Sequence, residues 1–250
     1  MTAEPALPAP STPAGGVAGR LPTCPATPVT APTTAPTTAP TTAPTTAPLA
    51  GPFGTGPRRA FLAAAVRSPG QIGAVAPSSP RLADLLASVV PTHGTPTVVE
   101  LGPGTGSVSA AIAERLPADA RHLAVELDPR LAAYLRRTRP DLEVVDGDAE
   151  HLTGLLAARS VPAVDAVVSG LPWSLFGGDT QRRILDQVAA AIGPTGAFAT
   201  FAYTHTAPMT TARRFRRMLS EVFDEVVVSR TIWRNLPPAY AYVCRRPRHG

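Results

Sequence analysis

The sequence of 250 residues contains no lysine, only two cysteines and no long apolar run. Without lysine the motif G-x-x-x-x-G-K-[ST] cannot occur, which excludes a P-loop nucleotide hydrolase. Cys24 lies in the proline-rich first part of the chain and Cys244 in its last apolar segment, so we expect no structural disulfide and a reducing compartment. No group of cysteines and histidines has the spacing of metal ligands, so we expect no metal site. No apolar run reaches the roughly 18 residues of a membrane span, and the first residues lack the regions of a signal peptide. We therefore expect a cytoplasmic protein, with peripheral contact at a membrane surface left open.

The first part of the chain has little that could form a core. Proline, alanine and threonine dominate residues 1–57, and TTAP occurs four times in succession in residues 33–48. Such a composition buries little apolar surface and favours polyproline II or coil. It predicts a disordered tail, with a glycosylated stalk as an alternative that would require export. Residues 58–250 are enough for one domain with its own core.

All 23 basic residues are arginines, and the formal net charge is +5. A positive balance favours anionic partners such as membrane headgroups or RNA. Residues 58–67 form an apolar stripe with arginines at both ends, which predicts either a core-packing helix or an amphipathic segment on a membrane. A second group of arginines is either a solvated helix face or a phosphate contact. Its members are Arg213, Arg214, Arg216 and Arg217.

A glycine-rich turn stands at the centre of the remaining sequence. Val98 and Val99 lead into Glu100, after which glycine occupies every second position from 102 to 106. Residues 107–116 then have a helical pattern. A strand that breaks into such a turn at the start of a helix forms a ligand crevice, because glycine permits positive φ and close approach of a ligand to the backbone.

Apolar strands alternate with helical segments after this turn. The expected strands are 122–126, 142–146, 164–168 and 197–203, and the helices between them include 129–137 and 180–192, the latter stopped by Gly193 and Pro194. This alternation is typical of a parallel sheet with helices on both faces. A helix over 210–222 and strands over 225–231 and 240–245 complete the domain, and Ser79 is expected to cap a helix that begins at Pro80.

Acidic residues follow three of these strands. Glu126 lies 20 residues after Gly106, the spacing at which a carboxylate meets ribose hydroxyls in nucleotide sites. Asp148 is placed to accept a hydrogen bond from an adenine amine, and Glu100 begins the glycine turn. A single acid of this kind is usually a solvated loop residue, but three in this order predict a nucleoside pocket. Ser107 occupies the third glycine position of the dinucleotide fingerprint, which argues against NAD or FAD.

The pattern E-L-G-P-G-T-G, with an acid after the second strand and an aspartate after the third, resembles the S-adenosylmethionine-dependent methyltransferases of the Rossmann-like class. The resemblance covers residues 58–245. It implies a three-layer α/β/α sandwich with a mostly parallel seven-stranded sheet, an antiparallel strand near the C-terminus, and S-adenosylmethionine as cofactor. The cofactor-binding residues that it implies are Glu100, Gly102, Gly104, Thr105, Gly106, Glu126, Leu127, Asp148, Ala149, Ser169 and Gly170.

Three segments at the edges of the domain, 71–79, 169–173 and 233–239, resemble bacterial phospholipid N-methyltransferases, which methylate phosphatidylethanolamine. These enzymes are similar to the ribosomal RNA adenine dimethyltransferases, in which an asparagine that orients the target amine stands where this chain has Gly170. The resemblance therefore implies a lipid amine as substrate. RNA adenine N6-methylation, methylation of a small molecule, and a catalytically silent lipid- or RNA-binding module are the alternatives.

Methyl transfer to an alkyl amine requires a neutral nucleophile, so a nearby group must accept a proton. Tyr203, His205 and Asp148 are the candidates for this role. Trp173 can face a methylated ammonium through a cation–π contact. The competing interpretations are that His205 is a surface loop residue and that Trp173 is a core aromatic.

Overall fold

The computed structural model describes residues 78–248 of the chain. The tail expected over residues 1–57 and the amphipathic helix expected over residues 58–67 lie outside the described residues, as does most of the segment 71–79. The proposed boundary between tail and domain therefore stays a prediction.

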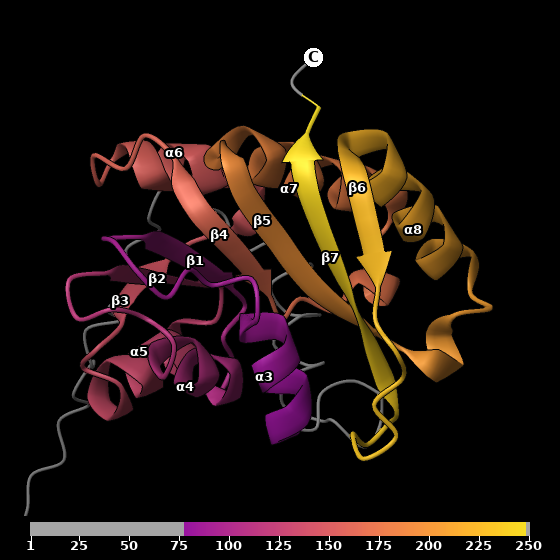
Figure 1. Cartoon of the computed structure of the whole chain (residues 1–250), viewed down its shortest axis with the longest axis horizontal. Coiled ribbons are helices and arrows are strands. Elements are labelled where there is room, and N and C mark those ends of the chain that lie inside the picture. The colour runs from indigo at the N-terminus through magenta and orange to yellow at the C-terminus, as the bar shows by residue number, and fades with distance from the viewer. Residues whose placement is uncertain (1–77, 249–250) are drawn as a thin grey trace, which may run out of the picture. The chain divides into compact units, whose positions relative to one another are not determined.

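A seven-stranded sheet forms the middle layer of the described part (Figure 1), in the order β3-β2-β1-β4-β5-β7-β6. The strands β1 to β5 pair in parallel, and β7 is antiparallel to both β5 and β6. This arrangement confirms the predicted sheet. The strand bounds are β1 Thr97–Leu101, β2 Arg121–Glu126, β3 Glu143–Asp146, β4 Val164–Ser169, β5 Ile192–Tyr203, β6 Phe223–Val228 and β7 Ala239–Pro247.

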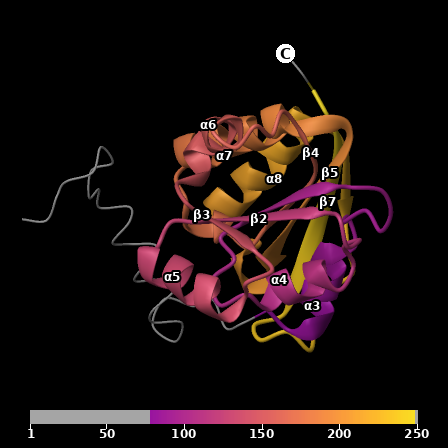
Figure 2. The same ribbon diagram turned by 90° about the vertical axis from the view of Figure 1, so that its left-hand side faces the viewer.

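Helices cover both faces of the sheet, as Figures 1 and 2 show: α3, α4 and α5 on one face, and α6, α7 and α8 on the other. Their bounds are α3 Pro80–Ala87, α4 Ser107–Ala113, α5 Pro129–Thr138, α6 Leu152–Ala157, α7 Gly178–Ala191 and α8 Thr210–Val222. The α3 start is as predicted, with the Ser79 hydroxyl accepting from the Leu82 amide and Pro80 in the first turn. None of the helices in the described part has the length and hydropathy needed to cross a membrane.

The core follows from strands that are apolar on both faces. Alternate residues of β1 face opposite helical layers, so that Val99 packs in the cluster with α6, α7 and α8, whereas Val98 packs with α3 and α4. The first cluster contains a group of aromatic rings from β5, α8 and β6, namely Phe198, Phe215 and Phe223. Because both faces of the sheet are buried, the sheet is rigid, and it holds the loops at the strand ends in fixed positions.

Several element boundaries differ from the predictions. Gly193 and Pro194 do not separate α7 from the next strand, because β5 begins directly at Ile192 and a register shift in its pairing with β4 accommodates them. The helix α6 was not predicted, since its six residues are too short for a periodic signal. The strand β6 starts two residues earlier than expected and ends at Val228, which assigns residues 229–231 to the following loop.

Candidate active site

The glycine turn joins the end of β1 to the start of α4. Gly102, Gly104 and Gly106 have φ values of +65°, +58° and +87°, a region that residues with a Cβ rarely adopt. A Cβ added at Gly104 would meet no heavy atom within 4 Å, so this glycine borders open space. The exposed Thr105 follows it on the turn. The turn therefore provides the close backbone approach that a cofactor requires.

Glu100 lies in β1, just before the glycine turn. Its carboxylate is buried and accepts a hydrogen bond of 2.6 Å from the Ser109 hydroxyl on α4. The His122 ring on β2 lies 3.3 Å from the same carboxylate oxygen, although the geometry there is not that of a hydrogen bond. The Ser109 hydrogen bond thus joins Glu100 on β1 to α4, and the place of Glu100 in the cofactor pocket stays a prediction.

Glu126 lies at the end of β2, beside the glycine turn. One oxygen of its buried carboxylate accepts from the Gly104 amide at 3.2 Å, and the other accepts from the Asp128 amide at 2.9 Å. Burial raises the pKa of Glu126 above its ordinary value, although the amides of Asp128 and Gly104 act in the opposite direction. A buried acceptor beside the glycine turn fits a ribose diol, which donates hydrogen bonds.

The raised pKa of Glu126 predicts a pH dependence for cofactor binding. A ribose held by Glu126 would donate its hydroxyl hydrogen bonds to the ionised carboxylate. The affinity for S-adenosylmethionine should therefore fall as pH decreases through the raised pKa, by about tenfold per pH unit below it. Folding stability should instead rise as pH falls through the same range. The reason is that the pKa of Glu126 is higher in the folded than in the unfolded protein, so the folded state binds the proton more tightly.

Calorimetric titrations of S-adenosylmethionine at a series of pH values measure this effect, with Glu126→Gln as the control. The variant should bind more weakly and show a flatter pH profile. A wild-type profile that is equally flat would contradict the assignment of Glu126 to the ribose.

The other acidic position, Asp148, caps the short 3-10 helix η1 (Ala149–His151). One of its carboxylate oxygens accepts from the Glu150 amide at 3.0 Å. Ala149 is buried beside it, and Leu127 is half-buried after β2. A hydrogen bond of 3.0 Å from the Gly147 amide to the Glu126 carbonyl joins the ends of β3 and β2. The ends of three adjacent parallel strands thus bring the glycine turn and both acids to one edge of the sheet.

The segment after β4 closes against the glycine turn. The Gly170 amide donates to the Leu101 carbonyl at 2.8 Å, and a Cβ at Gly170 would lie 2.7 Å from the Gly102 carbonyl oxygen. The Ser169 hydroxyl accepts from the Leu171 amide at 3.3 Å. The backbone approach at Gly170 leaves no room for a side chain, which explains in physical terms why asparagine is absent there.

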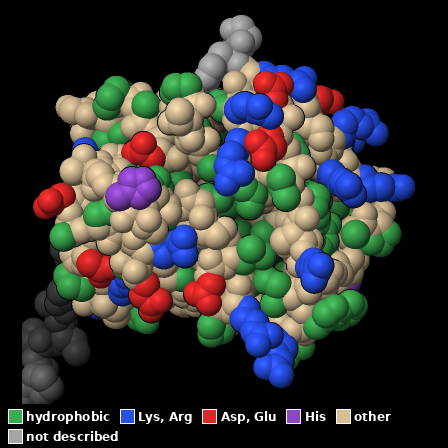
Figure 3. Space-filling model, viewed as in Figure 1, with side chains coloured by type: hydrophobic (Ala, Val, Ile, Leu, Met, Phe, Trp, Pro, Cys, Tyr) green, Lys and Arg blue, Asp and Glu red, His purple; other side chains and the backbone are tan. Residues whose placement is uncertain are grey.

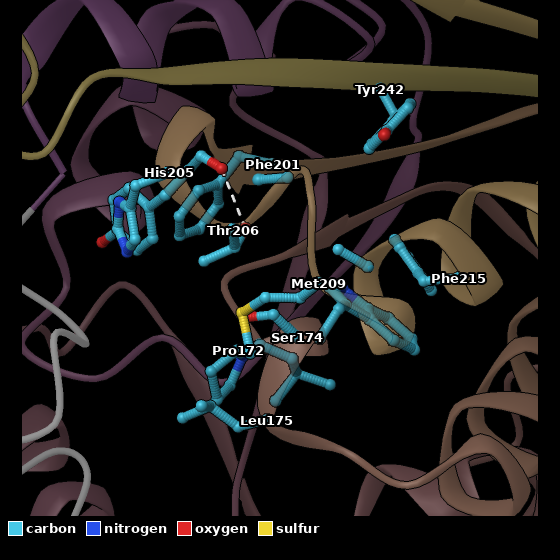
Figure 4. Close-up of a pocket in the computed structure, with 14 residues that line it drawn as sticks. Pro172, Ser174, Leu175, Phe201, His205, Thr206, Met209, Phe215 and Tyr242 are labelled. Atoms are coloured by element: carbon cyan, nitrogen blue, oxygen red, sulfur yellow. Dashed lines mark hydrogen bonds between the residues drawn. The ribbon is translucent and has the colours of Figure 1, made fainter.

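A cavity of about 340 Å³ lies beside this segment, at the ends of β4 and β5. Figure 4 shows Pro172, Leu175 and Met209 on one side of it and Phe201 and His205 on the other. Most of its lining is apolar. The complete lining consists of Leu171, Pro172, Trp173, Ser174, Leu175, Phe201, Ala202, Tyr203, His205, Thr206, Met209, Ala212, Phe215 and Tyr242.

Trp173 forms part of the cavity wall from within the core. Its side chain is only 2% exposed, and its ring stacks on Phe215 with centroids 4.3 Å apart. The indole N–H donates to the Thr200 hydroxyl at 2.8 Å, and that hydroxyl donates to the Ser169 carbonyl at 3.1 Å. These contacts favour the interpretation of Trp173 as a core aromatic that positions the post-β4 segment. Little of the ring is left to face an ammonium group.

Tyr203 and His205 lie together at the other end of the cavity. Their rings stack with centroids 5.6 Å apart, and the Thr206 hydroxyl donates to the Tyr203 carbonyl at 2.8 Å (Figure 4). His205 is exposed, whereas Tyr203 is half-buried. Asp148 does not line this cavity. The structure therefore brings two of the three proton-accepting candidates to the cavity and places the third, Asp148, after β3.

Sequence reasoning missed several residues that build this site. Gln181 on α7 is buried, and its amide N–H donates to the carbonyls of Trp173 and Thr211 at 2.8 and 3.2 Å. The Thr211 hydroxyl in turn donates to the Ser174 carbonyl at 2.8 Å. These bonds fasten α8 over the cavity. Thr200, a polar residue in an apolar strand, was the one signal that the sequence offered; Gln181 has no local pattern that distinguishes it from a surface residue.

Comparison with known proteins identifies the family. Residues 98–196 match a methyltransferase domain model. Over 177 residues the chain is 39% identical to an ornithine lipid N-methyltransferase of Singulisphaera acidiphila, a match that covers 70% of this chain and 88% of that protein. A shorter match of 35% identity relates it to ribosomal RNA small subunit methyltransferase A of Chlorobaculum parvum, over 31% of this chain and 27% of that protein.

Solved structures agree on the fold. A precorrin-6y C5,15-methyltransferase of Geobacter metallireducens has a TM-score of 0.52 at 16% identity, over 66% of this chain and 88% of that one. An S-adenosylmethionine-dependent O-methyltransferase of Thermotoga maritima has a TM-score of 0.54 at 14% identity, over 74% and 72%. On the match to the methyltransferase domain model and to the ornithine lipid N-methyltransferase, the chain belongs to the S-adenosylmethionine-dependent methyltransferases, and S-adenosylmethionine is its methyl donor.

Proposed function

We propose that this methyltransferase acts on the amine of a lipid headgroup. The observation that carries the proposal is the largely apolar cavity beside the post-β4 segment. The cavity lies next to the glycine turn, where we place the cofactor. Leu171 lines the cavity, and its side chain lies 2.8 Å from the position that a Cβ of Gly102 would take. A lipid amine needs such a site, with apolar walls for the glycerol or acyl region and a few polar groups at the reacting end.

The roles proposed for the cofactor side follow from the positions of the residues. Glu126 accepts from the ribose, Asp148 accepts from the adenine amine, and the glycine turn, with Thr105, Leu127 and Ala149 beside it, shapes the pocket. Ser169 and Gly170 present backbone groups to the methionine end. Support comes from the open space at Gly104 and from the two backbone amides that already donate to Glu126.

S-adenosylmethionine, when bound, supplies a methyl group that is already activated on a sulfonium. The chain must therefore hold a neutral amine in line with that methyl and exclude water. A protonated headgroup amine must first lose a proton, and the imidazole of His205, when neutral, can accept it directly or through water. The neighbouring Tyr203 ring contacts the His205 ring and limits its orientation. The lone pair of the amine can then form the new carbon–nitrogen bond as the carbon–sulfur bond breaks.

The relatives give independent support for a lipid substrate. The ornithine lipid N-methyltransferase match extends over most of both proteins, whereas the matches to ribosomal RNA small subunit methyltransferase A cover between 23% and 43% of this chain. RNA adenine methylation is the second candidate on account of those matches. The close backbone approach at Gly170 argues against it, since no asparagine side chain fits there.

Transfer of a radiolabelled methyl group to defined acceptors tests the proposal. Separate reactions contain liposomes with phosphatidylethanolamine, liposomes with ornithine lipid, ribosomal RNA, and buffer alone. We expect label in a lipid fraction and none in RNA. Label in RNA alone would overturn the lipid assignment, and no label in any fraction despite cofactor binding would favour a catalytically silent binding module.

A further inference from the structure

The loop that joins β6 to β7, residues 229–238, exposes two large apolar side chains. Trp233 is 75% and Leu236 is 76% exposed, whereas every other large apolar residue in the described range 78–248 is less than half exposed. In Figure 1 the loop lies where β6 ends and β7 begins. Because β6 runs parallel to β5, this is the same edge of the sheet that carries the site. The exposed side chains of Trp233 and Leu236 therefore lie at the end of the sheet that carries the candidate active site.

The loop is held by specific bonds at its base. Asn235 is 2% exposed. Its side-chain oxygen Oδ1 accepts from the Ser79 backbone amide at 2.9 Å, and its side-chain nitrogen Nδ2 donates to the Pro237 carbonyl at 2.7 Å. The Ile232 amide donates to the Ala239 carbonyl at 2.7 Å. Because these bonds hold the Asn235 side chain inside the protein, the apolar side chains of Trp233 and Leu236 on either side of it point outward.

Positive charge surrounds this pair. Arg230 and Arg234 are exposed, and within the described part of the chain neither makes an ion pair. At the opposite end of the same strands, by contrast, Arg245 and Arg248 pair with Glu225 and Asp224. Figure 3 shows positively charged side chains projecting from the β6–β7 end of this face, with apolar side chains beside them.

The base of the loop is also bonded to the cavity wall. The Pro238 carbonyl accepts from the Thr204 amide at 2.9 Å and from the Thr204 hydroxyl at 3.2 Å. Thr204 lies between Tyr203 and His205, which both line the cavity. A partner surface that binds the 229–238 loop would therefore lie close to the cavity in which we place the methyl acceptor.

We propose that the 229–238 loop docks the enzyme on an anionic lipid bilayer. Trp233 and Leu236 enter the interfacial region, where tryptophan is favoured, and Arg230 and Arg234 contact headgroup phosphates. The charge complementarity selects a bilayer over an apolar protein partner, because unpaired arginines flanking an apolar tip would be costly to bury against an uncharged surface. This inference rests on the proposed lipid substrate, but its test requires no methyl transfer.

Tryptophan fluorescence of the full chain measures the docking directly. The sequence contains two tryptophans; Trp173 is buried and Trp233 is exposed. Vesicles of phosphatidylcholine with phosphatidylglycerol should shift the emission to the blue and protect it from acrylamide, whereas pure phosphatidylcholine should have a weaker effect. Trp233→Phe should remove the shift and leave the emission of Trp173 unchanged. High salt should weaken the binding, because it screens the arginines.

Vesicle sedimentation of loop variants gives the magnitudes. Trp233→Ala combined with Leu236→Ala should lower partitioning by at least about tenfold, and Arg230→Ser and Arg234→Ser by about fivefold each on anionic vesicles. Tyr134→Ala, an exposed aromatic on α5, is the matched control and should partition as the wild type does. Calorimetry of S-adenosylmethionine binding checks that each variant is folded.

The docking proposal is overturned if anionic vesicles leave the emission unchanged, if the Trp233/Leu236 double variant partitions normally, or if RNA but not vesicles produces the shift. A blue shift that grows with protein concentration without vesicles would instead indicate that a second copy covers the loop, and would also overturn it. Vesicle binding without methylated lipid would leave docking intact and refute the proposed function. Methylated lipid without loop-dependent binding would do the reverse.

Discussion

Gly104→Val should abolish measurable binding of S-adenosylmethionine while the protein stays folded. The valine side chain would occupy the open space beside the turn, and a β-branched residue cannot easily keep the φ of +58° that directs the Gly104 amide to Glu126. Both effects act on the cofactor side, so we expect the dissociation constant to rise by at least about 100-fold, or about 2.7 kcal/mol.

Gly94→Val is a matched control for this experiment. Gly94 also has a positive φ, +78°, and also has no heavy atom within 4 Å of an added Cβ, but it precedes β1 at the opposite end of the strand from the turn. Both variants should lose similar stability in thermal unfolding, and only Gly104→Val should lose binding in calorimetry. Equal affinities in the two variants would show that the cofactor does not lie on the glycine turn.

Trp173→Ala should have the largest effect on stability, lowering the free energy of unfolding by about 3–5 kcal/mol. The substitution removes a buried ring that stacks on Phe215 and makes edge contacts with Phe176 and Phe198. It also leaves the Thr200 hydroxyl without its indole donor. Urea unfolding measures the loss.

Trp173→Phe separates ring packing from the indole hydrogen bond to Thr200, because phenylalanine retains an aromatic ring in the core and lacks the indole N–H. It should recover much of the stability lost in Trp173→Ala. If the indole instead recognised a methylated ammonium, Trp173→Ala would raise KM for the lipid and leave the unfolding free energy close to that of the wild type. That result would contradict the core interpretation.

The sequence predicted that the glycine turn, Glu126 and Asp148 lie together, because each of these signals is local. The glycine turn, Glu126 and Asp148 each follow a strand, and parallel strands bring their carboxyl ends to one edge without further information. The orientation of Glu100 could not be inferred in this way. Its carboxylate is buried by Ser109 from α4 and His122 from β2, and no spacing within one element reveals that partnership.

The acceptor side was less predictable for the same reason. The cavity is assembled from β5, α8 and β7 as well as the post-β4 segment, so Phe201, Met209 and Tyr242 meet only in the folded chain. The segment 233–239 suggested a family resemblance but not a role. Only the fold shows that Asn235 turns inward while Trp233 and Leu236 turn outward.

Methyl transfer to the nitrogen of a lipid headgroup can be detected on the lipid itself. The measurement is fragmentation mass spectrometry of phosphatidylethanolamine and ornithine lipid after incubation with the enzyme and S-adenosylmethionine. We expect headgroup fragments heavier by one or more methyl groups, with unchanged acyl fragments, in the wild type and not in Gly104→Val. Unmodified headgroups in both lipids, together with methylated adenine in ribosomal RNA treated in parallel, would contradict the proposed lipid substrate.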